Sequence, residues 1–166
     1  MNTEIETYRT LLREKYEELD CILDGLPDEA LLWQPFVESP WRGPANSLGF
    51  IVAHAVSSTV YLLRRAEWVL GRREWRDVEG DEGADEFGPD NYHVAYLRER
   101  VWRTHGIADA LLTAFVPPDL DATWTHPTES GRAFHVRYDI VHAIEHLSEH
   151  IGQAQLTRQL WALGSA

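Results

Sequence analysis

Apolar residues recur at intervals of three and four positions in four long segments of the chain, the spacing that lines one face of a helix. These segments span residues 3–25, 46–71, 91–115 and 134–162. Gly25 and Gly71 stand where the first two segments would end, and the Pro117-Pro118 pair ends the third. No strand signal of note interrupts the pattern. The sequence therefore predicts an all-α protein with four long helices.

The connections between these segments are long and uneven. In the first, Pro27-Asp28-Glu29 predicts a short helical turn, and Pro35 ends it. Residues 72–90 are acidic and glycine-rich, which predicts a solvated loop. The last connection contains His126, which is expected to be exposed. Four helices that share a core form a four-helix bundle, and 166 residues suffice for a single domain spanning residues 1–166.

The fourth segment contains three histidines in register, because His142, His146 and His150 follow one another at intervals of four residues. Residues four apart lie one turn above each other on nearly the same helix face. Imidazole is the commonest protein ligand for first-row transition metals, and two imidazoles on successive turns can bind one ion. The alternatives are a polar stripe facing solvent, or core histidines paired with Glu145 or Glu149. A metal site needs a third ligand from elsewhere, since two residues of one helix cannot complete it.

His54 is the best candidate for that third ligand. It lies early in the second segment, after an expected N-cap at Asn46 or Ser47, and between Ala53 and Ala55. An imidazole among small apolar neighbours needs a polar partner, because burying it without one is costly. Taken alone, His54 would be a hydrogen-bonded core residue; taken with the histidines of the fourth segment, it is favoured as a ligand.

The charge and composition of the chain restrict its partners. Lys and Arg number 15 against 27 Asp and Glu, which gives a formal net charge of −12. A nucleic-acid-binding surface needs massed basic residues, so no nucleic-acid partner is expected. The chain shows neither a membrane span nor a signal peptide, so we expect a cytoplasmic protein without a membrane partner. The lone Cys21 excludes an internal disulfide, and its place in the apolar pattern predicts a buried thiol rather than a nucleophile.

Three stretches resemble the DinB-like (DinB/YfiT) superfamily of bacterial metal-binding four-helix bundles. VHAIEHLSEHIGQ, residues 141–153, is similar to the family pattern of a histidine, three residues, a second histidine, one residue and Gly-Gln. FIVAHAVSS, residues 50–58, is similar to the stretch with a histidine early in the second helix. PDEALLWQP, residues 27–35, is similar to the usual connection after the first helix. The resemblance covers essentially the whole chain and implies a bundle of DinB/YfiT type.

The resemblance also implies a divalent ion, commonly zinc or nickel, held by His54, His146 and His150. The register of the Gly-Gln pair selects these residues over His142. His142 would then support a ligand, contact substrate or lie on the surface. Gln153 would lie one turn beyond the ligands, where packing is the alternative role.

Some family members resemble S-transferases that use a low-molecular-weight thiol such as mycothiol or bacillithiol. The leading hypothesis is therefore a metal-dependent, thiol S-transferase-like enzyme that acts on a small-molecule substrate. Three neutral imidazoles leave open positions on an ion, which can hold a thiol as thiolate or lower the pKa of water. A metal-dependent hydrolase and a non-catalytic metal-binding or stress-response protein are the alternatives. A homodimer is expected, because two-fold dimers are the commonest soluble oligomers.

Overall fold

The computed structural model of the chain describes residues 3–38, 43–79, 87–125, 131 and 133–164. The helices and strands in this part are, in chain order, α1 (Thr3–Leu23), α2 (Asp28–Leu32), α3 (Leu48–Val69), α4 (Trp75–Glu79), η2 (Pro89–Asn91), α5 (Val94–Ala114), η3 (Pro117–Asp121), β1 (Thr123–Thr125), β2 (Ala133–His135) and α6 (Val136–Gly164).

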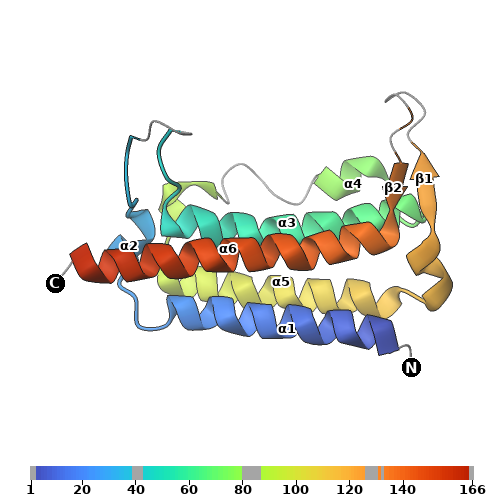
Figure 1. Cartoon of the computed structure of the whole chain (residues 1–166), viewed down its shortest axis with the longest axis horizontal. Helices are drawn as coiled ribbons and strands as arrows, with labels where there is room; N and C mark the ends of the chain where they lie inside the picture. Colours follow the sequence, from blue (N-terminus) through green and yellow to red (C-terminus); the bar gives the residue numbers. More distant parts are fainter. Residues whose placement is uncertain (1–2, 39–42, 80–86, 126–130, 132, 165–166) are drawn as a thin grey trace.

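The long helices of the described part are α1, α3, α5 and α6, and they form the four-helix bundle that the sequence predicts (Figure 1). α1 packs against α5 and α6, and α3 packs against the same two helices, so α1 and α3 lie diagonally across the bundle. α1 and α6 run in one direction, whereas α3 and α5 run in the other (Figure 1). The chain must therefore return along the bundle between α3 and α5, which explains the length of that connection.

α3 is the most buried helix of the bundle. Ser47 caps its start by accepting a hydrogen bond from the backbone N–H of Phe50 at 3.3 Å, which confirms the N-cap prediction. The apolar residues that recur at helical spacing along it are buried: Leu48, Ile51, Val52, Ala55, Val56, Val60, Leu63 and Val69. The helix is covered on several sides because α5, α6, α2 and α4 all pack against it. None of the helices in the described part combines the length and hydropathy that a bilayer span requires.

The connection between α5 and α6 contains a short antiparallel hairpin, although the sequence predicted no strand. Trp124 of β1 pairs with Phe134 of β2. Phe134 and His135, predicted to begin the last helix, belong instead to β2, and α6 begins at Val136. Strands of three residues are too short to show a recognisable alternation, which is why the prediction failed. His126 lies outside the described residues.

The connection predicted as a solvated loop contains a short helix, α4, in its described part. Trp75 of α4 packs on Trp68 of α3 with ring centroids 4.7 Å apart. Trp68 also contacts Trp124 and Phe134 at centroid distances of 4.2 and 5.5 Å. This aromatic cluster holds α4 and the hairpin at the same end of the bundle (Figure 1). Residues 80–86 of the connection lie outside the described part.

Some side chains within the apolar patterns of the sequence are exposed. Val141 and Leu156, apolar residues of the segment predicted as the last helix, are 45% and 56% exposed. Cys21 is exposed as well. Apolar periodicity identifies a helix, but single apolar residues also occur on protein surfaces, so it does not assign the burial of each one.

Gly49 allows the ring of Tyr92 to rest directly on α3. A Cβ atom at this position would lie 2.6 Å from Cγ of Tyr92 and 3.0 Å from the backbone oxygen of Leu31. We expect Gly49→Ala to lower the free energy of unfolding by about 1–3 kcal/mol, because the overpacking displaces Tyr92 or α2. Gly106 in α5 is the matched control, since a Cβ there would meet no atom within 4 Å.

For Gly106→Ala we expect a gain in stability of roughly 0.5–1 kcal/mol from the better helix propensity of alanine. Urea denaturation of the two variants and the wild type measures both effects. Equal changes at the two positions would show that the contact with Tyr92 does not matter.

Candidate metal centre

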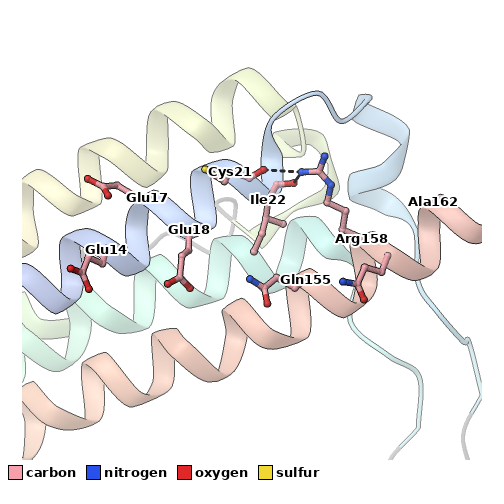
Figure 2. Close-up of a pocket in the computed structure, with 9 residues that line it drawn as sticks. Glu14, Glu17, Glu18, Cys21, Ile22, Gln155, Arg158 and Ala162 are labelled. Atoms are coloured by element: carbon pink, nitrogen blue, oxygen red, sulfur yellow. Dashed lines mark hydrogen bonds between the residues drawn. The ribbon is translucent and has the colours of Figure 1, made fainter.

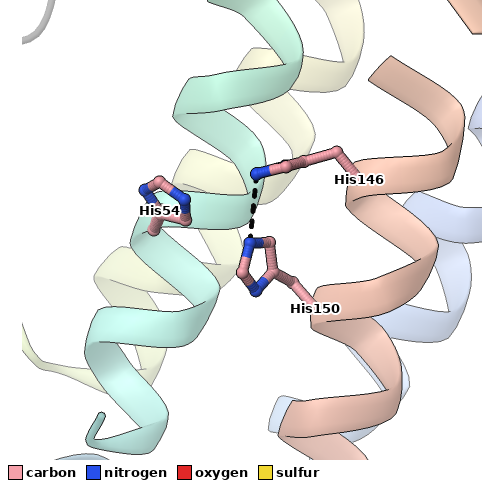
Figure 3. Close-up of side chains that lie close together, drawn as sticks. All are labelled: His54, His146 and His150. Atoms are coloured by element: carbon pink, nitrogen blue, oxygen red, sulfur yellow. Dashed lines mark hydrogen bonds between the residues drawn. The ribbon is translucent and has the colours of Figure 1, made fainter. Parts of the chain in front are cut away.

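His54 of α3 faces His146 and His150 of α6 across the seam between these neighbouring helices (Figure 3). Each imidazole offers one ring nitrogen, and the three nitrogens lie within 4.8 Å of one another. The Nε2 atoms of His146 and His150 are 3.2 Å apart. We call these residues the histidine triad. The structure thus brings together the three residues that the sequence selected as ligands, from two helices far apart in the chain.

The triad fits the requirements of a transition-metal ion. Two nitrogens bound to one tetrahedral ion at about 2.0–2.1 Å are roughly 3.3 Å apart, and His146 and His150 are separated by 3.2 Å. The nitrogens of all three residues lie within 4.8 Å of one another, which is wider than this ideal separation. A small movement of the side chains would therefore be needed for all three to bind one ion. Imidazole nitrogen suits zinc and nickel, and three protein ligands leave room for a further small ligand, as in catalytic sites.

Aromatic side chains enclose the His54 side of the triad. The ring of Phe50, one turn earlier in α3, stacks on His54 with centroids 5.9 Å apart and an interplanar angle of 8°. Phe87, which precedes η2, contacts the rings of Phe50 and His54 at 5.8 and 6.4 Å. The guanidinium of the buried Arg100 lies over the Phe87 ring, 5.7 Å from its centroid. These contacts orient His54 and form an apolar wall beside the triad.

Two polar side chains contact the triad. Oγ of Ser58 lies 3.4 Å from both ring nitrogens of His54. Oε1 of Gln153 lies 2.9 Å from Nδ1 of His150. The sequence placed Gln153 near the ligands, and the structure shows which atom it contacts. Ser58 was missed, although its position four residues after His54, on the same helix face, was an available signal.

His142 lies one turn away from the triad. Its ring centroid is 6.0 Å from that of His146, and the ring of Tyr138 stacks on it at 5.5 Å. Nδ1 of His142 lies 3.6 Å from Oε2 of Glu145, which makes an ion pair when the imidazole is protonated. His142 is therefore a neighbour of His146, and it lies outside the group of potential metal ligands.

Burial favours the neutral form of two of the triad histidines, His54 and His146. The pKa of His146 is lowered from 6.5 to about 4, and burial is the largest cause. The nearby imidazoles of His150, His54 and His142 lower it further. Burial and the imidazole of His150 also lower the pKa of His54. Nδ1 of His146 is buried and has no hydrogen-bond partner within the described ranges. Metal ions bind the neutral form of imidazole, so these residues are in the required form at pH 7.

We expect the metal-free protein to lose stability as the pH falls from 6.5 towards 4, because His146 then takes up a proton in the unfolded chain but not in the folded one. The pKa is lower in the folded state, so this contribution is complete above the unfolded pKa and disappears on acidification. Thermal unfolding of chelator-treated protein at several pH values measures the loss. His146→Asn removes the titrating group and should flatten the dependence; an unchanged slope would contradict the lowered pKa.

A separate groove of about 830 Å³ lies between α1 and α6 (Figure 2). Three glutamates line it, together with the exposed Cys21. At its rim, Arg158 donates hydrogen bonds to the backbone oxygens of Cys21, Ile22 and Asp24 at 2.8, 2.5 and 2.9 Å. Arg158 thereby satisfies carbonyl groups at the end of α1, which is a structural role. The groove contains none of the triad residues.

Comparison with protein families places the chain in the class that its fold and its triad indicate. The DinB superfamily model matches residues 11–154, a range that includes all three triad histidines. The chain belongs to the DinB superfamily, as its sequence motifs predicted. A search of curated protein sequences finds no significant match.

Among solved structures, the chain is similar to YfiT from Bacillus subtilis, described as a probable metal-dependent hydrolase with an unusual four-helix bundle topology. The two share 18% sequence identity over 96% of this chain and 89% of that chain, with a TM-score of 0.59. At this identity the similarity concerns the fold, and it confirms the predicted bundle.

Proposed function

We propose that the protein is a metal-dependent enzyme whose divalent ion is held by His54, His146 and His150. The observation that supports this most directly is the convergence of three imidazole nitrogens within 4.8 Å at the seam between α3 and α6. Zinc and nickel are the expected ions, since both accept imidazole ligands. When bound, such an ion acts as a Lewis acid that lowers the pKa of a thiol or a water molecule beside it.

We propose a thiol S-transferase-like activity, in which a low-molecular-weight thiol attacks a small electrophilic substrate. Among the described residues, the side chains outside the triad that hydrogen-bond to it are the hydroxyl of Ser58 and the amide of Gln153, and neither is a carboxylate that could act as a general base. A thiol has a free pKa of about 8.5, so it needs a much smaller shift than water to ionise at neutral pH. The apolar wall of Phe50 and Phe87 suits the organic part of the electrophile.

Metal-dependent hydrolysis is the second candidate. It is favoured by the description of YfiT, which has the same fold, as a probable metal-dependent hydrolase. The same triad would serve this reaction, with water in place of the thiol as the nucleophile. A non-catalytic metal-binding protein is the outcome if neither activity is found.

Metal-loaded protein incubated with monochlorobimane and a thiol such as bacillithiol separates these functions. In the expected reaction the thiol sulfur forms a bond to the bimane carbon, the C–Cl bond breaks, and chloride and a proton are released. Fluorescence should rise faster than in the uncatalysed thiol reaction only when the metal-loaded protein is present, and His150→Ala should abolish this increase. Hydrolysis of ester or amide substrates without thiol would support the second candidate instead. Protein that binds no zinc or nickel at neutral pH would reject both enzyme functions.

The predicted homodimer stays a prediction, which light scattering of the purified protein would test. A mass of about twice 19.1 kDa is expected for the dimer. A single-chain mass across the working concentration range would contradict it.

A further inference from the structure

The two ring nitrogens of His150 have different partners. Nδ1 lies 2.9 Å from the amide oxygen of Gln153, and Nε2 lies 3.2 Å from Nε2 of His146. An amide oxygen accepts hydrogen bonds and cannot donate one. The hydrogen of the neutral His150 ring therefore belongs on Nδ1. This leaves the lone pair on Nε2, the nitrogen that faces the rest of the triad.

The orientation of the Gln153 amide is itself determined by a neighbouring charge. Nε2 of Gln153 donates a hydrogen bond to Oε1 of Glu149 at 3.4 Å. An ionised carboxylate only accepts hydrogen bonds, so it attracts the amide nitrogen and leaves the amide oxygen for His150. Gln153 follows Glu149 by four residues and His150 by three, so consecutive turns of α6 bring these groups together.

We propose that Gln153 is a positioning residue that holds His150 in the tautomer required for metal binding, with hydrogen on Nδ1 and Nε2 free. This inference rests on the metal site proposed above. His146 provides a contrast within the same site, because its Nδ1 is buried without a hydrogen-bond partner among the described residues. Partners that fix the tautomer of a metal-binding histidine contribute about 10–100-fold to metal affinity. Gln153 is therefore expected to contribute to affinity without touching the ion.

Zinc affinity of the full-length protein, measured by competition with a chromophoric chelator, tests this role. Gln153→Leu removes the acceptor and should weaken zinc binding by about 10–100-fold. Gln159→Leu, at an exposed position of the same helix, is the matched control and should bind zinc as the wild type does. Exchanging the pair, with Glu149→Gln and Gln153→Glu together, keeps an acceptor beside Nδ1 and should restore affinity to within about threefold of the wild type.

The tautomer itself can be observed by nitrogen-15 NMR of the metal-free protein. Long-range correlations should report hydrogen on Nδ1 of His150 in the wild type and in the exchanged pair, and a mixture of tautomers in Gln153→Leu. Unchanged zinc affinity or an unchanged tautomer in Gln153→Leu would overturn the inference. Equal losses in Gln153→Leu and the exchanged pair would also overturn it, because a packing defect gives that result. If the wild type binds no zinc, the proposed function fails, and the NMR spectra still decide the role of Gln153.

Discussion

His150→Ala is expected to weaken the binding of zinc or nickel by at least about 100-fold, more than the loss of any residue that only supports a ligand. The substitution removes the nitrogen that lies 3.2 Å from Nε2 of His146 and leaves two ligands on two different helices. Isothermal titration of the chelator-treated variant and elemental analysis after dialysis measure the loss. Any metal-dependent activity should disappear with it.

His142→Ala is the matched control for this prediction. This substitution also removes an imidazole from α6, but one turn before His146 and at a residue outside the group of potential ligands. The control should retain about one ion per chain, as expected for a single three-histidine site. Equal losses in the two variants would show that the triad has been assigned incorrectly.

Asp139→Asn is expected to lower the free energy of unfolding by about 3 kcal/mol, because it leaves a nearly buried guanidinium without its counter-charge. Asp139 of α6 pairs with Arg65 of α3 through both carboxylate oxygens, and Nε of Arg65 donates to Oδ2 at 3.1 Å. The two side chains are 1% and 11% exposed. The pair joins the start of α6 to the same helix that holds His54, so its loss should also loosen the seam beneath the triad.

An exposed ion pair provides the control for Asp139→Asn. Arg76 and Asp77 are 3.7 Å apart, with side chains 85% and 54% exposed. Asp77→Asn should change the free energy of unfolding by less than about 0.5 kcal/mol, since exposed pairs are screened by water. Guanidinium denaturation of both variants measures the difference. A similar effect at the two positions would contradict a special contribution from the pair at the α3–α6 seam.

The long helices could be predicted from the sequence because each has a repeating apolar face, and the first three have an end marked by glycine or proline. The packing order could not, since periodicity does not say which helix lies beside which. α1 and α3 are consecutive long helices, yet they lie diagonally across the bundle. The hairpin and α4 were missed because they are short and depend on contacts among Trp68, Trp75, Trp124 and Phe134 rather than on local pattern.

The triad could be predicted because the four-residue spacing puts the histidines of the last helix on one face, and the family resemblance selects His146 and His150 over His142 and adds His54. What surrounds it depends on tertiary structure. Phe87 lies far from His54 in the sequence but reaches its ring through the connection before η2. The hydrogen bond from His150 to Gln153 depends on ring and amide orientations, which residue spacing alone does not determine. The prediction for Cys21 was wrong: the residue lies within an apolar pattern and was expected to be buried, but it is exposed.

A crystal structure of the zinc- or nickel-loaded protein, with anomalous diffraction recorded at the absorption edge of the metal, would test the proposed centre most directly. We predict one strong peak at the α3–α6 seam, about 2.0–2.1 Å from a ring nitrogen of each of His54, His146 and His150. A peak in the groove between α1 and α6, or one that leaves His54 uncoordinated, would contradict the account.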